Sequence, residues 1–228
     1  MLDAVLLEWE GVLADTAGAR RDALARALAA EGIRLDAPSW LTQSHDASTA
    51  DAISSALTQL GRADPTLADL VAARATRAFA ERLGQGFVLL PGAREFVEGM
   101  QLATRIAIVT SATRAETEFM LTLAGLERAV SLIVSADDDL DASPSSTTFE
   151  RALEYLSRRR PLRRDRVVAI APTAPALRAA RSVGVRTIAI GAPAHVAVDA
   201  DGAVDSIDGL SPADLVRLAG IASAEPRP

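Results

Sequence analysis

The sequence has 228 residues, of which 49% are hydrophobic and 24% charged, which fits one large domain or a medium-sized domain carrying a smaller one. Its net charge of −6 argues against a general nucleic-acid-binding protein. All 24 basic residues are arginine, so no lysine amine is available for chemistry. The absence of cysteine excludes disulfides, thiolate nucleophiles and cysteine metal sites.

The beginning of the sequence carries no sign of a targeting segment. Met1 leads into the short apolar run Ala4–Leu7 without a basic flank. No stretch of the sequence approaches the ~18 apolar residues that a membrane helix requires. We therefore expect a soluble, cytoplasmic protein that binds neither membranes nor nucleic acid.

Short apolar runs recur along the chain and alternate with longer helical patterns. The runs are continuous, which is typical of parallel strands buried on both faces. The alternation predicts an α/β fold with a doubly wound, Rossmann-like parallel sheet. The predicted strands are Ala4–Leu7, Ile106–Val109, Leu132–Val134, Val167–Ile170 and Thr187–Ile190.

Helix starts are marked by pairs of residues with capping spacing. These pairs are Thr113 with Glu116, Thr147 with Glu150, and Ser211 with Asp214.

The long interval between the first two strands is helical and predicts an inserted domain. We place this helical domain at residues 16–85 and the α/β core at residues 1–15 and 86–228. The predicted helices are roughly Arg20–Glu31, Thr49–Leu60 and Thr66–Leu83, followed by the helix-ending glycines Gly32, Gly61 and Gly84.

The most specific motif follows the first predicted strand. It reads Leu7-Glu8-Trp9-Glu10-Gly11-Val12-Leu13-Ala14-Asp15-Thr16. It resembles the first motif of the haloacid dehalogenase superfamily, in its phosphoglycolate phosphatase and β-phosphoglucomutase-like branch. That motif is an apolar strand followed by Asp-x-Asp-Gly-Val-Leu-x-Asp-Thr, and the match from Gly11 to Thr16 is very close.

The resemblance extends over nearly the whole chain. It implies a Rossmann-like core with an inserted helical cap, and it assigns phosphate binding in the second motif to Thr110. The further matching segments are Leu90–Ala93, Arg105–Ser111, Ile133–Asp138, Val167–Ala171 and Ala179–Gly184.

The catalytic positions of the family are mostly replaced in this chain. Glu8 stands where the family has its nucleophilic Asp, and Glu10 where it has the Asp that acts as general acid and base. Ser143 replaces the lysine of the third motif, and Pro172 replaces the metal-binding Asp of the fourth. Because strand ends meet at one edge of a parallel sheet, we expect Glu8, Thr110, Ser143 and Pro172 to converge under the helices of residues 16–85.

These replacements weaken every part of phosphoryl transfer. An Asp-to-Glu change moves the carboxylate by roughly 1.5 Å, and a displacement of ~1 Å can lower a rate by about 10²-fold. Pro172 offers Mg²⁺ no ligand, so Glu8 and Glu10 are left to hold Mg²⁺ weakly, and we expect no tightly bound cofactor. Arg114 is the nearest cation in sequence that could replace the lysine.

The resemblance and its departures together predict a pseudoenzyme with a hydrolase fold. It would act by binding a phosphorylated metabolite or a protein partner. The alternative is a weak Mg²⁺-dependent small-molecule phosphatase that uses Glu8 as nucleophile and Glu10 as acid and base. A third interpretation is a structural or oligomerisation module that uses the alanine-rich helical faces.

Each candidate residue also has an interpretation without a function. Glu8 and Glu10 fit solvated carboxylates at a strand end, and Thr110 with Ser111 fits a polar pair at a helix entry. Trp9 fits either core packing or stacking on a substrate. The remaining candidates fit surface features: His45, His195, the Asp137–Asp139 run with Asp141, and the arginines between Arg158 and Arg166.

Overall fold

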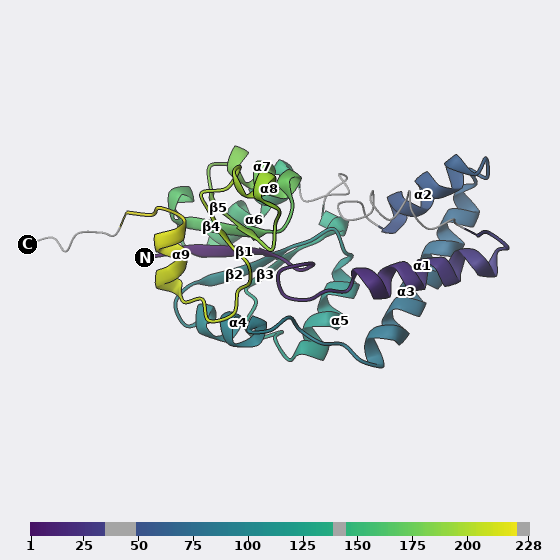
Figure 1. The fold of residues 1–228 in the computed structure, drawn as a ribbon, viewed down its shortest axis with the longest axis horizontal. Helices are drawn as coiled ribbons and strands as arrows, with labels where there is room; N and C mark the ends of the chain where they lie inside the picture. Colours follow the sequence, from purple (N-terminus) through teal and green to yellow (C-terminus); the bar gives the residue numbers. More distant parts are fainter. Residues whose placement is uncertain (35–48, 139–144, 223–228) are drawn as a thin grey trace, which may run out of the picture.

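The computed structural model describes residues 1–34, 49–138 and 145–222 (Figure 1). Within them, a six-stranded sheet has the order β3-β2-β1-β4-β5-β6, and every neighbouring pair is parallel. Its strands are β1 (Ala4–Glu8), β2 (Arg105–Val109), β3 (Leu132–Val134), β4 (Val167–Ala171), β5 (Arg186–Ile190) and β6 (Gly202–Val204).

The strand order confirms the doubly wound α/β fold. The chain runs from β1 outward through β2 to β3 and then returns to place β4 against the other side of β1. The central strands β1 and β4 are buried along their whole length, which explains their continuous apolar sequences. The order reverses between β1 and β4, and open α/β sheets bind ligands at the carboxyl ends of strands at such a switch point.

Helices cover both faces of the sheet (Figure 1). Val5 and Leu7 belong to one buried apolar cluster, and Ala4 and Leu6 belong to another, because successive side chains of a strand point to opposite faces. The first cluster includes residues of α4 (Ala93–Gln101), α5 (Arg114–Ala124) and α9 (Pro212–Leu218). The second includes residues of α6 (Ser146–Arg159) and α7 (Ala174–Ser182), while α8 (Ala194–Ala197) packs near β5.

Three helices lie beyond the carboxyl ends of the strands (Figure 1). They are α1 (Ala17–Ala30), α2 (Thr49–Gln59) and α3 (Pro65–Gly84), and they share a small apolar cluster of their own. Leu28, Ile53 and Val71 are fully buried in it, one from each helix. In the described part of the chain, none of the helices is long and apolar enough to cross a membrane.

Two local expectations are wrong. Helix α6 begins with a capping box between Ser145 and Thr148 rather than between Thr147 and Glu150, because the helix starts earlier, at Ser146, and the Ser145 hydroxyl accepts from the N–H of Thr148. The sheet also has the edge strand β6, whose residues Gly202–Val204 lack a continuous apolar run. The other two capping pairs are confirmed, at the starts of α5 and α9.

Candidate functional site

Three sequence-predicted positions meet at the carboxyl edge of the sheet. Glu8 is the last residue of β1 and pairs in register with Val109, which directly precedes Thr110. Pro172 directly follows β4, the other neighbour of β1. Glu8, Thr110 and Pro172 therefore lie at neighbouring strand ends, whereas Ser143 lies outside the described residues.

Glu8 and Thr110 are both largely shielded from solvent. Glu8 is 9% exposed and Thr110 is 7% exposed. The backbone N–H of Thr110 donates to the carbonyl of Val134 at 3.0 Å, and its hydroxyl accepts from the N–H of Ala112 at 3.1 Å. These bonds turn the chain from β2 toward α5 and leave the hydroxyl hydrogen of Thr110 able to donate to a ligand.

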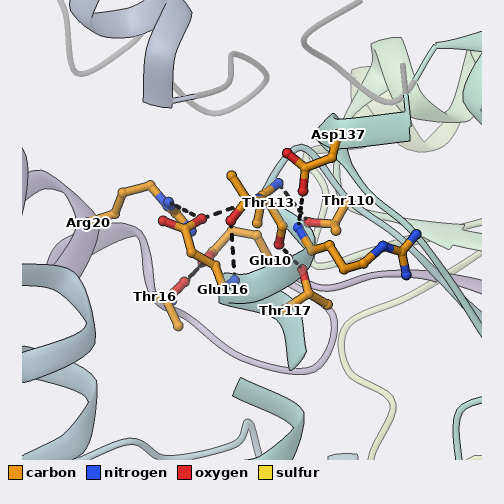
Figure 2. Close-up of polar contacts among 10 residues, drawn as sticks. Glu10, Thr16, Arg20, Thr110, Thr113, Glu116, Thr117 and Asp137 are labelled. Carbon is orange, nitrogen blue, oxygen red and sulfur yellow. Dashed lines mark hydrogen bonds and ion pairs between the residues drawn. The ribbon is translucent and has the colours of Figure 1, made fainter. Parts of the chain in front are cut away.

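Glu10 is turned toward the start of α1 (Figure 2). One carboxylate oxygen accepts from the backbone N–H groups of Thr16 at 2.8 Å and Ala17 at 3.2 Å. The other oxygen accepts from the hydroxyl of Thr16. Because the Thr16 side chain does not cap α1, Glu10 supplies the acceptor that satisfies the first amides of this helix.

Burial and the neighbouring polar groups shift the pKa of Glu10 in opposite directions. Burial raises the pKa of its carboxyl above the ordinary value, and the hydrogen bonds from Thr16 and the charge of Arg20 only partly offset that rise. A carboxyl with a raised pKa suits an acid, but this one is occupied by helix capping. The structure therefore favours a structural role for Glu10 in this arrangement.

Pro172 packs closely against the loop that carries Glu10. Gly11 has a φ of +73°, and a Cβ atom placed there would lie 3.1 Å from the Pro172 Cγ. A left-handed conformation and close contact both favour glycine at this position. The ring of Pro172 thus occupies space beside the loop at the position where the family motif has a metal-binding carboxylate.

Trp9 packs within the protein core. It is 1% exposed, and its ring stacks on Phe87 with a centroid distance of 6.2 Å and an interplanar angle of 18°. Its indole nitrogen is the one buried side-chain polar atom among the described residues that has no hydrogen-bond partner. Burial of the ring makes the interpretation of Trp9 as a substrate-stacking residue wrong for this conformation.

Arg114 is not placed to replace the missing lysine. Its guanidinium pairs with Asp138 at 2.7 Å and donates to the carbonyl of Ile133 at 3.1 Å. Its backbone N–H donates to Asp137 at 2.7 Å, which holds the start of α5 against the loop after β3. Two carboxylates of the aspartate run therefore serve this junction, and the rest of the run lies outside the described residues.

Other candidates lie on the surface. Arg158, Arg163 and Arg164 pair with Glu154, Asp165 and Glu150, which agrees with a solvated charged surface. His195 is exposed in the short helix α8, and His45 lies outside the described residues.

Sequence reasoning missed an ion pair beside the site. The Arg20 guanidinium of α1 lies 3.1 Å from the Glu116 carboxylate of α5 (Figure 2). It also lies 4.2 Å from the centroid of the Phe79 ring of α3. Glu116 also completes the capping box with Thr113. The capping spacing was the only sequence signal here, and it points to a helix start rather than to a partner 96 residues away.

The described residues at this edge offer few ligands for a magnesium ion. Glu10 is held by three hydrogen-bond donors of residues 16 and 17, and Pro172 has no carboxylate to offer. Among residues 1–34, 49–138 and 145–222, no group of three or more histidine or acidic side chains is placed to hold a metal ion. Mg²⁺ prefers near-octahedral oxygen coordination and usually takes one or two carboxylates together with water. Glu8, at the end of β1, remains as a carboxylate at this edge that could contribute a ligand.

A comparison with known protein families identifies the family of this chain. The haloacid dehalogenase-like hydrolase family matches residues 6–190. The chain belongs to this family. The match spans β1 through β5, and therefore includes both the sheet edge and the three helices beyond it.

Solved structures of the superfamily align with this chain over nearly its full length and share its fold. β-Phosphoglucomutase from Clostridium difficile superposes with a TM-score of 0.82 at 15% identity, covering 96% of this chain and 98% of that one. CbbY from Rhodobacter sphaeroides, in complex with phosphate, gives 0.81 at 24% identity, covering 94% and 99%. A hydrolase from Pseudomonas syringae gives 0.74 at 21% identity, covering 98% and 100%. No curated protein matches the chain in sequence.

Proposed function

We propose that this haloacid dehalogenase-like protein binds a phosphorylated small molecule at the carboxyl edge of its sheet and does not turn it over at the rate of an intact phosphatase. The observation that carries the proposal is the position of Glu10, whose carboxylate caps α1. Glu8, Glu10 and Thr110 are the proposed site residues, and residues 16–85 are the proposed cap on a core of residues 1–15 and 86–228.

Two observations support a phosphate as the bound group. Thr110 stands at the position that the family motif uses for phosphate, and its hydroxyl retains a hydrogen to donate. The related CbbY structure contains phosphate and has the same fold. The loss of the family's lysine and metal carboxylate removes catalytic groups but leaves the Thr110 hydroxyl in place.

Binding is tested by titrating a panel of small phosphate esters into the protein while following its melting temperature. We expect at least one ester to raise the melting temperature, and Thr110→Val to abolish that rise. Thr117→Val is the matched control, because Thr117 is also buried, in α5, and its hydroxyl donates to the Thr113 carbonyl. An equal loss in both variants, or no shift with any ester, contradicts the proposed site.

Turnover is tested with the same esters in the presence of Mg²⁺. We expect a rate at least ~10³-fold below that of an intact family member, since a displaced nucleophile and a lost cation act together. The triple variant with Glu8→Asp, Ser143→Lys and Pro172→Asp should be faster than the parent. A robust Mg²⁺-dependent rate that Glu8→Gln abolishes would instead establish the weak phosphatase with Glu8 as nucleophile.

A further inference from the structure

We propose that the Arg20–Glu116 ion pair is a latch that holds α1 and α3 closed over the carboxyl edge of the sheet. The two residues come from different parts of the fold: α1 lies beyond the strand ends, and α5 covers one face of the sheet (Figure 1). The latch controls access to the proposed binding site, and in that respect it rests on the proposed function.

The ion pair is more buried than a typical surface pair. The side chains of Arg20 and Glu116 are 25% and 7% exposed, the lowest combination among the ion pairs of the described residues. Separating them breaks the ion pair and its charged hydrogen bond, and the water that enters as α1 moves away only partly replaces Arg20 as the partner of the Glu116 carboxylate. The closed arrangement is therefore favoured over one in which α1 has moved away from α5.

Each residue of the ion pair is also held by a contact that does not involve the other residue. Arg20 lies over the ring of Phe79, so its guanidinium stays with α1 and α3. Glu116 is held by its capping box with Thr113, so its carboxylate stays with α5. Because both partners are oriented before they meet, little side-chain entropy is lost when the pair forms again.

The segments that connect the helices to the core provide a pivot for this motion. The N–H of Leu90 donates to the carbonyl of Leu13 at 2.9 Å, and Ala14 forms an antiparallel bridge with Leu89. These contacts hold the outgoing and returning segments together beside the sheet. A rotation about them would separate α1 from α5, and the ion pair lies on the path of that separation.

The test measures opening directly, without any ligand. The chain contains no cysteine, so Ala25→Cys on α1 and Gln101→Cys on α4 place two spin labels at exposed positions without background labelling. Pulsed electron–electron double resonance then gives the distribution of distances between the two labels. In the parent we expect one narrow distribution, corresponding to the closed arrangement.

Glu116→Gln is the informative variant, because glutamine still completes a capping box but carries no charge. We expect it to raise the population at longer distances roughly five- to thirtyfold. Glu81→Gln is the matched control, since it removes the same charge from the exposed Arg77–Glu81 pair within α3. Its distribution should equal that of the parent.

Arg20→Gln tests the same pair from the other side, and it keeps the test valid if Glu116→Gln does not fold. We expect the double variant to open no further than either single variant, because both remove one interaction. Unchanged distributions in the single variants, or additive opening in the double variant, would overturn the latch. Failure of phosphate esters to bind would leave these distances unchanged and would overturn only the proposed ligand.

Discussion

Replacing Glu10 by alanine tests whether this residue is a helix cap. The change removes the acceptor of two backbone N–H groups, those of Thr16 at 2.8 Å and Ala17 at 3.2 Å, and of the Thr16 hydroxyl. Thr16 is 2% exposed, so water does not readily replace the lost acceptor. Loss of an N-terminal cap and its charged hydrogen bonds should lower the free energy of unfolding by about 2 kcal/mol.

This loss is measurable by chemical and thermal denaturation. For a chain of this size, about 2 kcal/mol corresponds to a decrease of about 4–8 °C in melting temperature. Glu10→Gln should retain most of the stability, because the amide oxygen can still accept from the same N–H groups. The control Glu81→Ala, at an exposed position on α3, should change stability by less than about 0.5 kcal/mol.

The pH dependence gives a second measure of the same residue. Burial raises the pKa of Glu10 in the folded state, so the folded protein binds this proton more tightly than the unfolded chain. The resulting stabilisation is fully present below the unfolded pKa and is lost as the pH rises through the folded pKa. Glu10→Gln does not titrate, so its stability relative to the parent should increase from acidic to neutral pH.

Two outcomes would refute this reasoning about Glu10. One is a Glu10→Ala variant as stable as Glu81→Ala, which would mean that the cap contributes nothing. The other is a stability difference between Glu10→Gln and the parent that stays constant over the titration of the carboxyl.

Two further predictions concern the loops and the metal. Gly92→Ala should destabilise the protein by about 1–3 kcal/mol more than Gly125→Ala in urea denaturation. Both glycines have a positive φ, so the backbone strain is shared. A Cβ at Gly92 would lie only 2.5 Å from the Asp208 Cα, whereas a Cβ at Gly125 would lie 3.8 Å from its nearest neighbour, an arginine nitrogen. Equal losses would contradict this packing. Calorimetry should detect no tight stoichiometric Mg²⁺ binding to the parent, because Pro172 supplies no carboxylate, and tight binding at neutral pH would overturn this expectation.

Much of the architecture is determined by local sequence. Continuous apolar runs such as Val167–Ile170 predict buried parallel strands, because a strand covered on both faces has no solvent-facing position to alternate. Capping spacing likewise predicts the starts of α5 and α9, since the interacting groups are three residues apart. The family motif adds the approximate location of the site, at the end of the first strand.

The sequence did not predict features that depend on contacts between residues far apart in the chain, or elements only a few residues long. Strand β6 is a three-residue edge strand that depends on pairing with β5, so it carries no buried run of its own. The commitment of Arg114 to Asp138 depends on how β3 leads into the next loop. Neither feature has a periodicity that could be found before folding.

The sequence alone determined the fold class and which residues stand at the motif positions, because both follow from local patterns. Only the tertiary structure decided what those side chains do. Glu10 faces the first amides of α1 because the loop turns at Gly11 beside Pro172. Arg20 meets Glu116 because α1 and α5 are brought together across 96 residues of chain, and such a contact depends on packing rather than on spacing.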